Sequence, residues 1–168
     1  KIEMAPVGDG AILEDAQALV DRYLGSENAP KLSVSKQGKA TKAAYRPSAD
    51  TVIMPDSKDF YTPEAYYSTM FHELGHSTGH PTRLGRFSKD MVIPSFGSED
   101  YSKEELVAEF TSAFLCHVTG VENELPQSAS YIANWAKVIR TDRKMIVTSA
   151  TKALKSAKLV EGLGTERK

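Results

Sequence analysis

The chain has 168 residues, a formal net charge of −1, an apolar content of 40% and a single cysteine, Cys116. This length fits one domain, so we expect a single domain over residues 1–168, with fraying ends at 1–10 and 160–168. One cysteine excludes an internal disulfide framework, and the absence of a long apolar run excludes a membrane-spanning segment; both favour a cytoplasmic protein.

The charge is unevenly distributed along the chain. From Tyr131 to the end, nine Lys and Arg side chains face only three acidic ones, and the rest of the chain is acidic. Such a basic stretch is typical of a solvated helix face. The alternative is a patch that binds DNA or an acidic partner.

The N-terminal third predicts one helix and a small twisted sheet. Apolar residues recur at helical spacing over residues 12–24, and Gly25 ends this helix. Short β-prone runs follow at 32–35, 44–46 and 50–54. Because 50–54 directly precedes the next helix, we expect it at the sheet edge beside that helix, where it would take a substrate backbone by strand addition. A plain buried strand is the alternative.

A second helix is predicted from Thr62 onward. Thr62 offers a capping hydroxyl, Pro63 is tolerated in the first turn, and Gly79 and Pro81 end the helix. Gly75 in mid-helix costs about 1 kcal/mol relative to alanine, which suggests that another segment or a substrate backbone comes close there. The apolar stripe of this helix consists of Tyr67, Met70, Phe71 and Leu74.

The same helix carries the pattern HExxH. His72 and His76 are four residues apart and therefore share one helix face, so both imidazoles can reach a single Zn²⁺ while Glu73 lies beside the open coordination position. This arrangement is typical of zinc peptidases, in which zinc lowers the pKa of bound water to about 7. The glutamate takes the proton and returns it to the leaving amine. We predict a zinc site with these two ligands and with Glu73 as the catalytic base; ordinary helix histidines and a surface acid are the alternative.

The third ligand is expected from the following helix. Residues 81–101 are typical of a long loop, either a wall or lid of the cleft or a surface connection. Capping-box spacing from Ser102 to Glu105 predicts a helix that runs to Gly120. A catalytic zinc site needs a third protein ligand. We favour Glu109, because the capping box already explains Glu105; in the alternative, Glu105 is the ligand and Glu109 accepts a hydrogen bond from a ligand imidazole.

Two further residues are candidates for contact with the substrate or an oxyanion. His80 lies at the end of the HExxH helix, where it could ligate metal or contact substrate. Tyr131 could donate to a developing oxyanion, and a packed aromatic is the alternative. Helical spacing predicts two more helices, over 131–139 and over 143–157, the second capped by Asp142.

The ordered set of motifs resembles the zincin-like metallopeptidase domain of ArdC-type antirestriction proteins and of the polyvalent proteins of plasmids and phages. The resemblance covers about residues 50–160. It is carried by the blocks 66–80, 83–84, 96–99, 104–109, 113–115 and 129–135.

The resemblance implies an α+β zincin-like fold, in which a small twisted sheet accompanies an HExxH helix, a second ligand-bearing helix and C-terminal helices. It also implies Zn²⁺ held by His72, His76 and an acid from the Glu105/Glu109 segment, with Glu73 as catalytic base. The implied partner is a protein or peptide substrate. DNA would be bound by a separate domain or by the basic C-terminal helices.

Our leading hypothesis is therefore a zinc-dependent peptidase domain from a mobile-element antirestriction or polyvalent protein. The first alternative is a non-catalytic, metal-stabilised binding module that acts on DNA or on a host defence protein. Hydrolysis of a non-peptide bond is the second alternative. Metal content and charge reversal in the C-terminal helices distinguish the first two.

Overall fold

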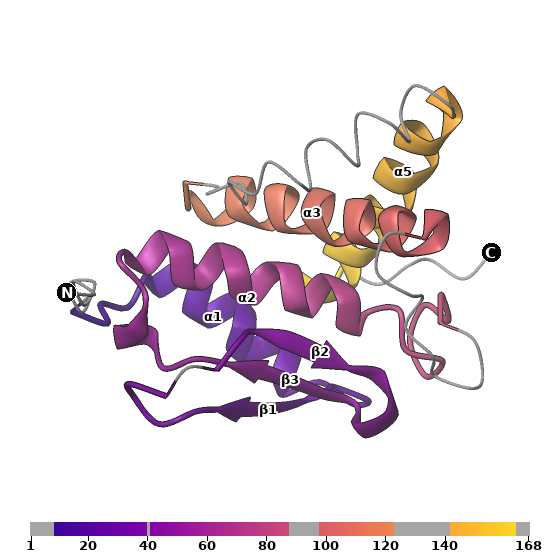
Figure 1. Ribbon diagram of the computed structural model, residues 1–168. Coiled ribbons are helices and arrows are strands. Elements are labelled where there is room, and N and C mark those ends of the chain that lie inside the picture. Colours follow the sequence, from indigo (N-terminus) through magenta and orange to yellow (C-terminus); the bar gives the residue numbers. More distant parts are fainter. Residues whose placement is uncertain (1–8, 40, 88–97, 123–141, 164–168) are drawn as a thin grey trace, which may run out of the picture.

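The protein has the α+β architecture expected from the sequence (Figure 1). The structure is a computed structural model. It describes residues 9–39, 41–87, 98–122 and 142–163. Helix α2 (Pro63–Ser77) lies between a three-stranded sheet and α3 (Glu99–Thr119), with α1 (Glu14–Leu24) against the same side of the sheet and α5 (Arg143–Val160) packed on α3.

The sheet is mixed, and its strand order differs from our expectation. β1 (Lys31–Val34) pairs in parallel with β3 (Thr51–Met54), and β2 (Ala44–Arg46) pairs antiparallel with β3, which gives the order β1-β3-β2. The prediction that residues 50–54 form the edge strand was wrong, because β3 is the central strand. The edge strand next to α2 is β2 (Figure 1).

A tight connection between β2 and β3 accounts for this order. The 3-10 turn Pro47–Ala49 is followed by Asp50, which has a left-handed backbone with φ 44°. The Asp50 carboxylate accepts a hydrogen bond from the Tyr45 hydroxyl at 2.7 Å and pairs with the guanidinium of Arg83. The hairpin places β2 on one side of β3, which leaves the other side for β1.

Helix α2 begins and ends as its sequence predicts. The Thr62 hydroxyl accepts a hydrogen bond from the backbone N–H of Ala65 at 3.1 Å, and Pro63 occupies the first turn. The helix ends at Ser77. The predicted apolar stripe is buried in the core: Tyr67, Met70, Phe71 and Leu74.

Helix α3 begins earlier than we expected. Its N-cap is Ser98, whose hydroxyl accepts a hydrogen bond from the backbone N–H of Tyr101 at 3.1 Å. The predicted capping box at Ser102 was wrong, because Ser102 lies inside the helix and donates to the Ser98 carbonyl. The predicted end is confirmed, with Gly120 as a left-handed C-cap.

Helices α2 and α3 approach closely at Gly75. A Cβ atom at this position would lie 3.1 Å from Cβ of Thr111 and 3.2 Å from Cα of Ala108. The Ser112 hydroxyl adds a 2.8 Å hydrogen bond to the Ser68 carbonyl. The expectation that Gly75 makes room for another segment is therefore correct, and that segment is α3.

The core joins the sheet to the helices. It includes Val52 and Met54 of β3, Val20 and Tyr23 of α1, Cys116 of α3, and Ala157 and Val160 of α5. The predicted cap of α5 is confirmed, since the Asp142 carboxylate accepts from the Lys144 backbone N–H at 3.0 Å. Among the described helices, none is both long and apolar enough to cross a bilayer.

Some of our predictions concern residues that the structure does not describe. The predicted helix over 131–139 and residues 88–97 of the predicted long loop lie outside the described residues. The predicted frayed ends at 1–10 and 160–168 also lie mostly outside them.

Candidate metal centre

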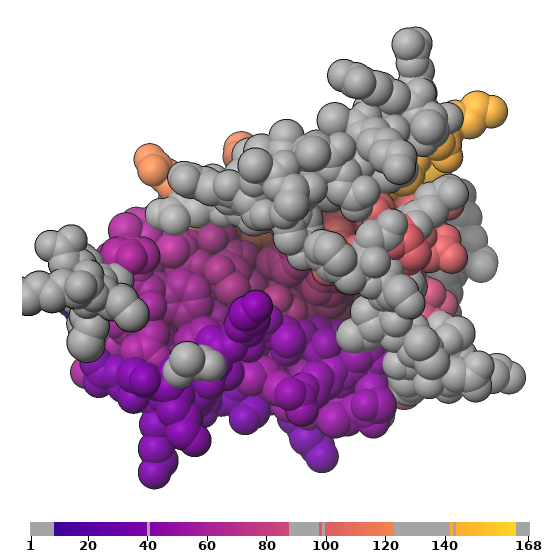
Figure 2. All heavy atoms as spheres, in the orientation of Figure 1, coloured from indigo at the N-terminus to yellow at the C-terminus, as the bar shows by residue number. Residues whose placement is uncertain are grey.

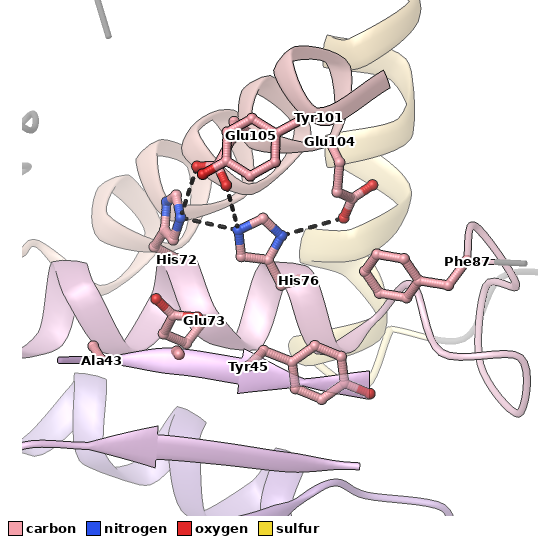
Figure 3. A pocket seen from close by; sticks show the side chains of 10 residues that line it. Ala43, Tyr45, His72, Glu73, His76, Phe87, Tyr101, Glu104 and Glu105 are labelled. Atoms are coloured by element: carbon pink, nitrogen blue, oxygen red, sulfur yellow. Dashed lines mark hydrogen bonds and ion pairs between the residues drawn. The ribbon is translucent and has the colours of Figure 1, made fainter. Parts of the chain in front are cut away.

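The two histidines of α2 direct their Nε2 atoms toward each other. His72 and His76 are one helical turn apart, their rings meet edge to face with centroids 4.7 Å apart, and the two Nε2 atoms are 3.1 Å apart (Figure 3). Two nitrogen lone pairs at this distance repel each other unless a proton or a metal cation lies between them. The pair is therefore suited to bind a cation.

The carboxylate of Glu105 completes a triangle of donor atoms. Its Oε2 lies 3.5 Å from Nε2 of His72, and its Oε1 lies 3.5 Å from Nε2 of His76. Donors bound at about 2.0–2.1 Å to a tetrahedral ion lie roughly 3.3 Å apart, close to these separations. Within the described part of the chain, these three residues are the one group whose ligand atoms all lie within 4.8 Å of one another. The donor set thus fits a small divalent ion.

Each histidine also contacts an acid from α3 through its other ring nitrogen. Nδ1 of His72 lies 3.2 Å from Oε1 of Glu109, and Nδ1 of His76 lies 3.4 Å from Oε1 of Glu104. Glu109, the glutamate that we favoured as third ligand, therefore lies behind His72, while Glu105 faces both Nε2 atoms. This is the arrangement of the alternative that the sequence left open.

The carboxylates raise the pKa values of both histidines. Burial lowers the pKa of His76, but hydrogen bonds to Glu104 and Glu105 outweigh this effect and raise the pKa to about 9. Burial also lowers the pKa of His72, and Glu105 and Glu109 outweigh it, so that this pKa rises too. In turn, the two histidines outweigh the effect of burial on Glu105 and lower its pKa. The cluster therefore carries an excess of negative charge that attracts protons or a metal cation.

The cluster forms one wall of a cavity of about 230 Å³. Glu73 is only 7% exposed and lines this cavity beside the histidines (Figure 3). Ala43 and Ala44 line it from the strand side, and Tyr101 and Glu104 line it from α3. In the space-filling view the surface is hollowed over α2, above the strand residues (Figure 2). The cavity brings an acid, two imidazoles and a strand edge together.

Several residues at this site were missed by the sequence reasoning. Tyr45 and Phe87 close the end of the cavity next to His76, with ring centroids 6.1 Å apart. Glu104 and Tyr101 come from α3. A signal for these two was present, because the residues of α3 that face α2 recur at helical spacing: Tyr101, Glu104, Glu105, Ala108, Glu109 and Ser112. No local sequence pattern predicts Phe87 as a site residue, because its position at the cavity depends on the tertiary fold.

Of the two other candidate residues, only His80 is described, and it is not brought to the cavity. His80 is buried, but its Nδ1 contacts the Thr82 hydroxyl at 2.7 Å and accepts from the Thr82 backbone N–H at 3.2 Å, so its ring supports the turn after α2. It does not line the cavity. Tyr131 lies outside the described residues.

Known proteins resemble this chain over most of its length. Residues 28–152 match the family of zincin-like metallopeptidases. The protein named DNA primase TraC of Escherichia coli is 42% identical over 120 residues, which cover 71% of this chain and 11% of that protein. The uncharacterized protein y4eC of Sinorhizobium fredii is 40% identical over 114 residues, which cover 67% of this chain and 36% of that protein. The chain thus spans a small part of these relatives.

Solved structures agree with this relationship. The Mn(II)-bound antirestriction protein ArdC of the R388 plasmid is 30% identical with a TM-score of 0.72, over 98% of this chain and 57% of that one. The same protein without metal aligns with a TM-score of 0.69. Together with the donor set, these likenesses indicate a divalent metal ion at the centre described above. The matched segment covers most of the chain, which therefore belongs to the zincin-like metallopeptidase family.

Proposed function

We propose that this chain is a zinc-dependent peptidase domain, with His72, His76 and Glu105 as ligands and Glu73 as general base. The observation that carries the proposal is the convergence of the two Nε2 atoms and the Glu105 carboxylate on the wall of a cavity that Glu73 also lines. Family membership supports the reaction class. Two histidines and one glutamate are a donor set typical of catalytic zinc sites.

In this proposal the residues of the chain divide the chemistry among them. A divalent ion, when bound, supplies Lewis-acid polarisation of a peptide carbonyl and lowers the pKa of water. Glu73 accepts a proton from the attacking water and delivers it to the leaving amine. Its burial and its place beside the histidines support this role. Glu109 holds His72 from behind, because an acceptor at Nδ1 orients the ring and fixes its tautomer.

We further propose that the substrate is a peptide in extended form, bound along β2. This is supported by the position of β2 at the sheet edge, by its proximity to α2 and by the small side chains of Ala43 and Ala44 on the cavity wall. An extended peptide gains backbone hydrogen bonds when it adds to such an edge. This role replaces the one that we expected for residues 50–54.

The biological setting is proposed from the relatives. The likeness to the antirestriction protein ArdC supports a role against host restriction systems. We further propose that the protein acts in the cytoplasm on a host protein. ArdC has been crystallised both with Mn(II) and without metal, which supports an ion that serves chemistry rather than the fold. DNA would be bound by a separate domain.

A second candidate function is a non-catalytic binding module for DNA or a host defence protein. One observation favours it: α5 contains no acidic residue, and its side chains Lys144, Lys152, Lys155 and Lys158 are exposed. A basic helix of this kind fits phosphates or an acidic surface. Charge reversal at Lys152 and Lys155 separates the candidates, because it should abolish binding in the module and leave peptide cleavage by the peptidase intact.

The decisive experiment compares wild type with Glu73→Gln, both loaded with one equivalent of Zn²⁺. The substrates are unfolded casein and a library of peptides, and the products are identified by mass spectrometry. We expect cleavage by wild type and at least a hundredfold slower cleavage by Glu73→Gln at unchanged metal content. Equal cleavage by both proteins would overturn the proposal, and so would wild type that binds Zn²⁺ but cleaves nothing.

A further inference from the structure

Arg86 uses all of its hydrogen-bond donors inside the protein. A guanidinium carries five N–H donors. The side chain of Arg86 is only 9% exposed. Its contacts are two bonds to the Glu104 carboxylate at 3.0 and 2.8 Å, and single bonds to the Thr78 hydroxyl at 2.8 Å, the Ser156 hydroxyl at 3.0 Å and the Gly75 carbonyl at 2.9 Å.

These acceptors belong to three helices or their ends: α2, α3 and α5. Gly75 lies in α2 next to His76, Glu104 lies in α3 next to Glu105, and Ser156 lies in α5. A guanidinium that is bonded on every side cannot rotate without breaking several of these contacts. The side chain of Arg86 is therefore held in one position relative to α2 and α3, the two helices that carry the proposed ligands.

The bidentate pair fixes the plane and position of the Glu104 carboxylate. Glu104 is 14% exposed, and the same Oε1 that accepts from Arg86 at 2.8 Å lies 3.4 Å from Nδ1 of His76. Two parallel bonds from one guanidinium hold a carboxylate more precisely than a lysine ammonium can, because the ammonium is a point donor. A carboxylate acceptor at Nδ1 keeps the proton of a neutral imidazole on that nitrogen, which leaves Nε2 with its lone pair.

Charge supports the same role. Glu73, Glu104, Glu105 and Glu109 surround the two histidines, whereas Arg86 is the one arginine or lysine in a salt bridge with any of these acids among the described residues. Its charge offsets the repulsion that Glu104 would otherwise meet from Glu105 next to it in the chain. Without Arg86, Glu104 would be pushed toward solvent and away from His76.

A close contact after α2 explains how Arg86 comes to lie between the three helices. The backbone N–H of Phe87 donates to the Gly79 carbonyl at 3.0 Å, and a Cβ atom on Gly79 would lie 2.7 Å from the ring of Phe87. Only glycine leaves room for this ring. The contact brings the segment that carries Arg86 back against the end of α2.

We propose that Arg86 is a positioning residue for the metal centre, which acts through Glu104 to hold His76 with Nδ1–H directed outward and Nε2 directed at the metal. The inference rests on the metal site proposed above, and it does not depend on peptide cleavage. Arg86 contacts no ligand itself in the contacts described. Its effect on metal affinity must therefore disappear when Glu104 can no longer transmit it.

The test is a double-mutant cycle with Zn²⁺ affinity as its readout, measured by competition with a chromophoric chelator. The variants are Arg86→Lys, Glu104→Gln and the double variant. We expect each single variant to weaken Zn²⁺ binding by about 10- to 100-fold, the range found for groups that orient metal ligands. The double variant should bind within about twofold of Glu104→Gln, because coupled residues are not additive.

Arg83→Lys is the matched control. Arg83 is also buried, with its side chain 4% exposed. Its five donors are also used, on the Asp50 carboxylate, the Tyr45 hydroxyl and the carbonyls of Ser77 and Asn28, but it contacts no histidine of the site. This variant should lower the thermal unfolding temperature and leave Zn²⁺ affinity unchanged within about twofold.

Two results of the affinity measurements would overturn the inference: wild-type Zn²⁺ affinity in Arg86→Lys, or an effect of Arg86→Lys that persists in full in the Glu104→Gln background. A further readout keeps Arg86 unchanged and compares wild type with Glu104→Gln. In ¹⁵N NMR spectra, the Nε–H signal of Arg86 should move when Zn²⁺ is added to wild type and should stay in place in Glu104→Gln. An unmoved Arg86 signal in wild type would also refute the coupling.

Discussion

Nδ1 of His72 lies 3.2 Å from Oε1 of Glu109, while Nε2 of the same ring lies 3.5 Å from Oε2 of Glu105. A metal ion at the Nε2 side leaves Nδ1–H free to donate to Glu109. We therefore expect Glu105→Gln to lose its metal on dialysis, whereas Glu109→Gln should retain about one ion per chain with 10- to 100-fold weaker affinity. Metal content by mass spectrometry checks this, and the reverse pattern would make Glu109 the ligand.

Metal affinity should rise with pH. The carboxylates raise the pKa of His76 to about 9 and also raise that of His72, and a protonated imidazole cannot ligate a metal. Binding at neutral pH must therefore release protons, so affinity should increase about tenfold per pH unit for each proton displaced, up to the pKa. Calorimetric titration with Mn²⁺ between pH 6 and 8, in buffers of different ionisation enthalpy, measures both the metal affinity and the number of protons released. A pH-independent affinity would contradict this prediction.

Gly75→Ala should destabilise the protein despite the higher helix propensity of alanine. The new Cβ would meet Thr111 and the backbone of Ala108 at 3.1 and 3.2 Å, and the α3 backbone cannot yield easily. Overpacking costs about 1–3 kcal/mol, against a gain of about 1 kcal/mol from propensity. We expect a lower urea midpoint and weaker metal binding, because α3 carries Glu105. An increased urea midpoint would show that the two helices can separate without cost.

The Asp50–Arg83 pair should stabilise the fold only above the acid range. Burial raises the pKa of Asp50, but Arg83 and Tyr45 outweigh this effect and lower it. A lowered pKa means that this contribution to the free energy of unfolding is present above the unfolded-state pKa of about 3.9 and is lost as the pH falls through the folded-state value. Asp50→Asn should therefore be less stable than wild type at pH 7, with the difference shrinking toward pH 3. Urea unfolding at several pH values tests this, and a constant difference would assign the effect to packing.

The helix that carries His72 and His76 could be predicted because its signals are local. The cap at Thr62, the apolar stripe and the HExxH spacing all lie within one stretch of about four turns, and each points to the same helix. The start of α3 was harder to predict from the sequence, because Ser98 and Ser102 both precede helix-forming residues and only Ser98 is the N-cap. Placing the start at Ser102 gave Glu105 a capping role, and this moved our preference to Glu109.

Relations between distant segments could not be predicted. The position of β3 in the centre of the sheet depends on the pairing of β1 with it across the sheet, which no local pattern encodes. The contact of Glu104 with His76 depends on where α3 crosses α2, and the return of Arg86 depends on the packing of Phe87 against Gly79. Sequence periodicity predicts which side of each helix is packed against the rest of the protein, but it does not predict which element packs there.

The bond between Arg86 and Ser156 joins residues 70 positions apart in the sequence. During synthesis the two histidines leave the ribosome first, then Arg86, then the glutamates of α3, and the hydroxyl of Ser156 follows near the end of the last described helix. Chains grow at about 5–20 residues per second, so the early histidines wait several seconds for their final surroundings. The contact that ties Arg86 to α5 can therefore form only when nearly all of the described chain has been made.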